Sequence, residues 1–131
     1  MITANLLQLL ENNGLGKLGE TLFWEKLTLG EVGVYIASIG NRTERGERRA
    51  QTFELYSRGK TDTDGYKRLK AIVDFLNSAY EVCSLPAVYE DGVLKSESIE
   101  RITIMPCSSI TNGGLDDNGR VIWTATGMIY Y

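Results

Sequence analysis

The chain has 131 residues, a formal net charge of −3 and no histidine. This length predicts one domain, residues 1–131, that buries about two-thirds of its unfolded surface. The acidic balance argues against a protein whose main task is to grip nucleic acid, and the lack of histidine removes the commonest metal ligand and the commonest general base near neutral pH.

The first part of the chain predicts a helix followed by two extended segments. Leucines at helical spacing predict a helix over residues 2–12, with Thr3 or Asn5 as its cap. Residues 21–25 form a short extended run. Residues 32–39 are rich in β-branched side chains and are apolar on both faces, which predicts a central strand.

The middle of the chain predicts a strand and the most regular helix. Residues 51–57 alternate, with Phe53 and Leu55 facing inward. A helix follows, capped by a residue among positions 62–64. Its apolar stripe predicts one broad buried face, formed by Tyr66, Leu69, Ile72, Val73, Leu76, Ala79 and Tyr80.

The last third predicts further strands joined by turns. Residues 87–90 are extended before an Asp91-Gly92 turn, residues 100–107 alternate as a strand, and residues 120–131 form the longest strand. Residues 111–119 are rich in turn formers. The order predicts an α+β fold: one domain with a mostly antiparallel sheet of four to five strands, two helices packed on one face and a long projecting hairpin loop.

That projecting loop carries the most unusual composition in the chain. Residues 40–49 hold four of the eight arginines and have a net charge of +2, which leaves −5 for the remainder. The loop is a solvated hairpin tip, a contact with a partner or another subunit, or a nucleic-acid contact. The last is the least favoured because no aromatic residues interleave with the arginines. The residues proposed for an assembly interface are Arg42, Arg45, Glu47, Arg48 and Arg49.

Two other motifs favour structural interpretations. Residues 14–19 match G-x-G-x-x-G, but they follow a helix and lead into a strand, the reverse of a dinucleotide-binding site, so we expect a connection. Residues 116–119 lack the ligand spacing of a calcium loop and predict a hairpin turn. Without histidine no serine triad can be assembled, so we expect no enzyme, no cofactor and no metal site.

Cellular context follows from the apolar residues and the cysteines. No apolar stretch is long enough to cross a bilayer and the first five residues lack a basic n-region, so we expect a soluble chain made in the cytoplasm, without a membrane partner. Cys83 and Cys107 lie in runs that look packed. We expect two buried free thiols in a reducing compartment.

Three segments carry a resemblance to a known family: the Leu-rich first helix, the Val-Gly-Val-Tyr-Ile-Ala-Ser-Ile strand at residues 32–39, and the Trp-Thr-Ala-Thr-Gly-Met-Ile-Tyr-Tyr strand at residues 123–131. In these segments and in element order the chain resembles the tail terminator family of long-tailed bacteriophages, which is also labelled phage minor capsid (neck) proteins. It departs from the family in two places. Its hairpin is rich in arginine, whereas the hairpin of some relatives is acidic, and the connection at residues 14–19 also differs.

The resemblance implies a structural virion protein of the tail and neck, assembled in the host cytoplasm. It implies a homohexameric ring that caps the tail tube, ends its polymerisation and joins the tail to the head. The implied partners are further copies of the chain, the major tail tube protein, and the head–tail connector or a head completion protein. Genome DNA would pass through the lumen without specific binding, which suits a negative overall charge. The alternative is a small protein- or nucleic-acid-binding module that acts through residues 42–49.

Overall fold

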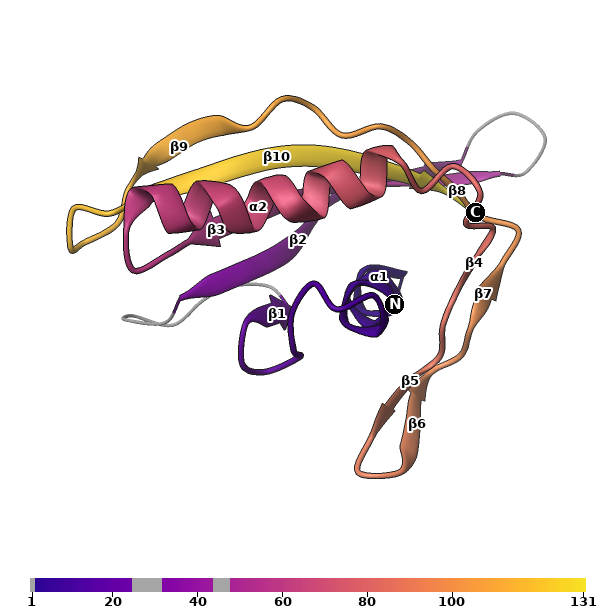
Figure 1. Ribbon diagram of the computed structural model, residues 1–131. Coiled ribbons are helices and arrows are strands. Elements are labelled where there is room, and N and C mark those ends of the chain that lie inside the picture. Colours follow the sequence, from indigo (N-terminus) through magenta and orange to yellow (C-terminus); the bar gives the residue numbers. More distant parts are fainter. Residues whose placement is uncertain (1, 25–31, 44–47) are drawn as a thin grey trace.

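The computed structural model describes residues 2–24, 32–43 and 48–131 and has an α+β fold (Figure 1). The described residues contain two helices, one large sheet and two pairs of short strands. In chain order the elements are α1 (Ile2–Asn12), β1 (Leu22–Trp24), β2 (Gly33–Thr43), β3 (Arg49–Arg58), α2 (Asp62–Asn77), β4 (Ser84–Leu85), β5 (Val88–Glu90), β6 (Val93–Ser96), β7 (Ile99–Glu100), β8 (Thr103–Ile104), β9 (Thr111–Leu115) and β10 (Val121–Tyr130).

The large sheet has the strand order β1-β2-β3-β10-β8, and β9 pairs with β10 beside β8. β1 runs parallel to β2, and the other neighbours are antiparallel. The predicted α+β class and mostly antiparallel sheet are confirmed. The sheet gains a strand because residues 111–115, which we expected to be turn-rich, pair with the first half of β10 as β9.

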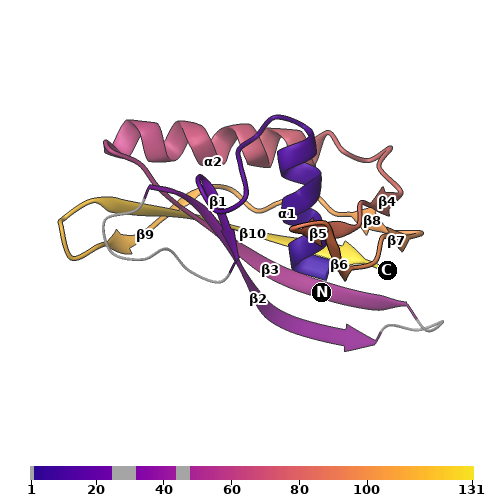
Figure 2. The same ribbon diagram turned by 90° about the horizontal axis from the view of Figure 1, so that it is seen from below.

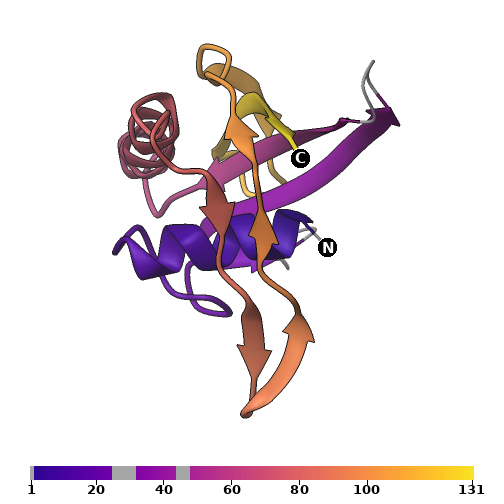
Figure 3. The ribbon, with the colours of Figure 1, turned by 90° about the vertical axis from the view of Figure 1, so that its right-hand side faces the viewer.

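Both helices cover the same face of this sheet, as Figures 2 and 3 show. Phe53 and Leu55 of β3 point into the core as predicted, and the alternation of the strand places Glu54 on the opposite face. Gly127 of β10 lies directly against the ring of Phe53, where a Cβ atom would clash. The core combines this sheet face with apolar side chains of both helices: Leu6, Leu7, Leu10, Leu69, Ile72 and Leu76.

The opposite face of the sheet has no helix over it in the described residues. Tyr35 and Tyr56 stack there with ring centroids 4.6 Å apart, and both are half-buried, while Ile39 is exposed. Burial raises the pKa of Tyr35. The positive charge of the nearby Arg58 partly offsets this increase, and the negative charge of Glu54 adds to it. The prediction of a central strand is confirmed, since β2 lies between β1 and β3, and its second apolar face carries the stacked tyrosines.

The helix starts differ from the predicted caps. α1 begins at Ile2, so Thr3 and Asn5 lie within it and are buried. Thr3 Oγ1 accepts a hydrogen bond from Trp24 Nε1 instead of capping. α2 is capped by Thr61, whose hydroxyl accepts from the backbone N–H of Asp64, whereas we expected a residue among positions 62–64.

The strand predicted over residues 100–107 is broken in the structure. Arg101 adopts a left-handed conformation with φ of 59°, which ends β7 and separates it from β8. Residues 84–100 instead make a long hairpin, the arm, from the pairs β4–β7 and β5–β6. In Figure 3 the arm extends past α1 and away from the sheet.

The cysteines are less buried than we expected. Cys83 is exposed in the connection to the arm, and Cys107 is only partly buried, so the prediction of two buried thiols is wrong. Both are free, and burial raises the pKa of Cys107 to about 11. Cys83 directly precedes the arm and Cys107 follows β8, and in these runs side chains such as Leu85 and Ile102 enter the core instead.

Candidate assembly surfaces

The arginine-rich segment lies at the end of a long two-stranded hairpin. β2 and β3 pair from Gly33 and Arg58 to Thr43 and Arg49, so the strands take in much of the segment that we predicted as loop. The backbone of Arg49 also exchanges two hydrogen bonds with Tyr131, at 2.8 and 2.9 Å. The last residue of the chain therefore pairs with the base of the hairpin end (Figure 1).

The structure describes three of the five predicted interface residues, Arg42, Arg48 and Arg49. Arg48 turns back onto the domain: its Nη2 donates to Thr103 Oγ1 at 3.1 Å, and its guanidinium lies 5.5 Å from the centroid of the Tyr130 ring. The Arg49 side chain is exposed, and the Arg42 backbone pairs with Ala50. Arg45 and Glu47 lie outside the described residues. Among the described members, the exposed Arg49 is thus the best placed for contact with a partner.

The arm is a second projection, which the sequence did not predict, and a buried asparagine holds its base. Asn5 of α1 donates from Nδ2 to the carbonyls of Pro86 and Glu97, both at 2.9 Å, and its Oδ1 accepts from Ser96 Oγ at 2.7 Å. The Asn5 side chain is fully enclosed. One helix residue therefore fixes both strands of the arm through three hydrogen bonds.

The tip of the arm is a tight hairpin with exposed apolar side chains. Asp91 and Gly92 have φ of 53° and 78°, the positive values that a two-residue type I′ turn needs, so the predicted Asp-Gly turn is confirmed. Tyr89 is 62% exposed and Val93 56%, and Leu94 is also exposed. Apolar side chains gathered at a projecting tip indicate contact with another surface.

An apolar cavity of about 470 Å³ lies between α1, β1 and the arm. Leu7 and Leu22 line its inner side, and the partly exposed Trp24 lies at its edge. Val88 and Lys95 contribute the wall on the arm side. The arm and α1 therefore enclose a recess between them.

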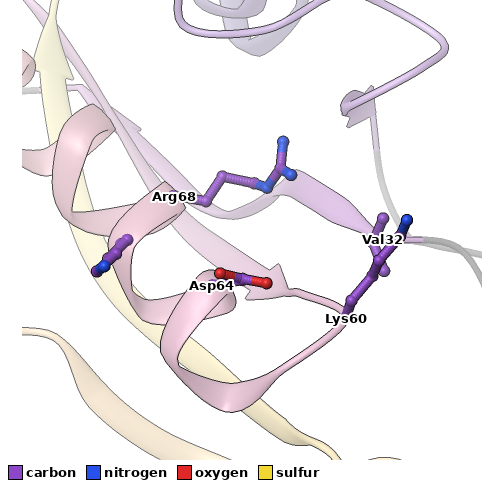
Figure 4. Close-up of a pocket in the computed structure, with 5 residues that line it drawn as sticks. Val32, Lys60, Asp64 and Arg68 are labelled. Carbon is purple, nitrogen blue, oxygen red and sulfur yellow. The ribbon is translucent and has the colours of Figure 1, made fainter.

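A basic pocket of about 560 Å³ lies at the other end of the molecule, at the start of α2 (Figure 4). Lys60, Lys67 and Arg68 supply three positive charges, against one negative charge from Asp64, and Val32 forms part of the wall. The Nε atom of Arg68 is buried and has no hydrogen-bond partner among the residues that the structure describes. A buried N–H without an acceptor is unfavourable, so this pocket favours an anionic group.

The predicted turn at residues 116–119 is confirmed as the connection of the β9–β10 hairpin. Within this turn the Asp116 carboxylate binds several groups. It accepts from the backbone N–H groups of Asn118 and Arg120 and from Arg120 Nε, and it lies 3.4 Å from Arg58 Nη1. Burial opposes the ionised form, but these hydrogen bonds and the two arginine charges outweigh it and lower the pKa of Asp116. The arrangement serves to fix the hairpin.

The described residues contain no cluster of three or more His, Cys, Asp or Glu side chains able to hold a metal ion. Neither described helix combines the length and apolar character that a membrane crossing needs. The surface features described above are the two projections, the recess beside the arm and the basic pocket.

The chain matches no protein-family model and no curated protein. The functional assignment therefore rests on the fold and these surfaces.

Proposed function

We propose that this protein is a structural component of the virion of a long-tailed phage. Copies of the chain form a homohexameric ring that caps the tail tube, ends its polymerisation and joins the tail to the head connector. The observation that carries the proposal is a small sheet domain with two separate projections, the β2–β3 hairpin and the arm. A ring subunit in a joint needs surfaces for its neighbours as well as for the structures above and below it.

The β2–β3 hairpin is the proposed contact with the tube, the connector or the next subunit. The exposed Arg49 guanidinium can pair bidentately with a carboxylate of the partner. Arg48 holds that end of the hairpin against the rest of the sheet through its contacts with Tyr130 and Thr103. Genome DNA passes through the lumen without specific binding, in keeping with the net charge of −3.

Native mass spectrometry and negative-stain electron microscopy of the purified chain test the proposal. We expect closed rings of one size, and we expect Arg49→Glu to weaken the assembly of rings or their attachment to tail tubes. Lys17→Glu makes the same charge change at an exposed position outside the hairpin and is the matched control. A chain that stays monomeric with and without tail tubes would contradict the proposal.

The second candidate is a binding module that uses residues 42–49, and the exposed Arg49 in a segment of net positive charge favours it. This candidate predicts a monomer whose affinity for DNA falls steeply with salt, because each phosphate contact releases a counterion. Ring formation without salt-dependent DNA binding would exclude it.

A further inference from the structure

Two surfaces of this chain complement each other in charge and lie far apart on the molecule. We propose that the tip of the arm in one copy docks into the basic pocket at the start of α2 in the next copy. This inference rests on the proposed ring and names the two surfaces that hold its subunits together. The occupant of the pocket is a second copy of this chain.

The pocket is built to receive an acidic group. Lys60 and Lys67 are exposed at its rim, and Arg68 extends from α2 into the space beside Asp64 and Lys60 (Figure 4). Arg68 adds a third positive charge to those of the two lysines, and Asp64 is the acidic residue in the described lining, so an incoming carboxylate would meet a net positive surface. The aliphatic stems of the lysines and Val32 give the pocket an apolar wall.

The tip of the arm presents matching chemistry. Glu90 and Asp91 place two negative charges at the turn, and both are exposed. Tyr89 and Val93 flank them with exposed apolar surface. Glu90 and Lys95 both also line the recess that faces α1, whereas Asp91 lies at the turn itself. The most distal part of the arm is therefore acidic and apolar, as the pocket requires.

The placement of the two surfaces suits a ring. The arm and the first turn of α2 lie at opposite ends of the molecule in Figure 1. A contact between two different surfaces is head-to-tail, and it closes into a ring when the rotation between subunits divides a full turn. Asn5 and the type I′ turn hold the arm in one conformation, which reduces the entropy lost when the tip docks.

Charge reversal on each surface tests the pairing. The arm variant is Glu90→Lys/Asp91→Asn, in which asparagine is chosen because it tolerates the positive φ at position 91. The pocket variant is Lys60→Glu/Lys67→Glu, which changes exposed side chains and leaves the core intact. Single-site controls with charge changes of the same sign are Glu100→Lys at the base of the arm and Lys17→Glu between α1 and β1, both at exposed positions. Thermal melts check that every variant folds.

We expect each reversed variant alone to lose the rings, with association weakened by at least about tenfold, while both controls keep them. An equal mixture of the arm and pocket variants should regain rings that contain both chains in equal number, because the reversed arm fits the reversed pocket. Native mass spectrometry reads this composition directly. Arg68→Gln should weaken rings made by otherwise unchanged chains.

The outcomes separate this inference from the proposed function. If the unchanged chain forms rings and both reversed variants keep them, the pairing is overturned and the ring proposal stands. If the mixture fails to regain rings, the pairing of these two surfaces is likewise overturned. If the unchanged chain forms no rings with or without tail tubes, the proposed function fails and the inference fails with it.

Discussion

Asn5→Ala is expected to release the arm from the domain. The substitution removes two hydrogen bonds that the Asn5 amide donates to the carbonyls of Pro86 and Glu97, and one that it accepts from Ser96. Alanine keeps the helix, since it has the highest helical propensity. The change therefore acts on the attachment of the arm and leaves α1 as it is.

The magnitude follows from the three bonds. Each contributes about 0.5–1.5 kcal/mol net, so the loss of all three lowers the free energy of unfolding by about 2–4 kcal/mol. Out of a total of about 5–15 kcal/mol for a domain, this is a large fraction. Gln8→Ala is the matched control, because the Gln8 amide donates to Glu11 and Asn12 on the same helix, near solvent.

Urea denaturation gives the free energy of unfolding, and amide hydrogen exchange gives the local opening of the arm. We expect Asn5→Ala to speed exchange in β5 and β6 and to shift the denaturation midpoint, while Gln8→Ala changes stability by under about 0.5 kcal/mol. A change as small as this for Asn5→Ala, with unaltered exchange in the arm, would refute the role of this residue.

Three further expectations follow from the packing and the titratable groups. Gly127→Ala should lower the free energy of unfolding by about 1–3 kcal/mol, because the new Cβ atom would press on the Phe53 ring. Gly40→Ala is the control, since Gly40 has open space around it and the substitution should be nearly neutral in urea melts. Equal effects of the two substitutions would contradict this packing. Mass spectrometry after brief alkylation should find Cys83 modified first, since burial raises the pKa of Cys107 to about 11, and equal labelling would contradict that order. Because folding lowers the pKa of Asp116, its ionised carboxylate stabilises the folded state at pH values above 3.8, the ordinary pKa. This stabilisation is lost as the pH falls through the lowered pKa of the folded state, and Asp116→Asn should remove this part of the acid transition.

Local patterns predicted the two helices and the longest strands of this fold. The apolar stripe of α2 predicted the burial of Leu69 and Leu76, but Tyr80 lies beyond the helix and is exposed. Alternation predicted β3 and β10, and the Asp91-Gly92 pair predicted its turn because few residues tolerate two consecutive positive φ angles.

The sites could not be predicted in the same way, because they depend on pairs of residues far apart in the chain. Nothing local marks Asn5 as the residue that fixes the arm, since its partners lie more than 80 positions away. The basic pocket combines Lys60, which precedes α2, with Arg68 of the helix and Val32 from a distant part of the chain, and no local pattern marks this set. The break at Arg101 is likewise set by tertiary contacts, in which the Ile102 N–H bonds to the Cys83 carbonyl.

The central claim is that copies of this chain close into a ring through head-to-tail contacts. The most direct test is electron microscopy with class averaging of the purified chain, alone and after addition of tail tubes. We expect closed rings with a central lumen and one subunit number, either free in solution or seated at the end of each tube. Monomers or two-fold dimers in both preparations, with tube ends left bare, would contradict the account.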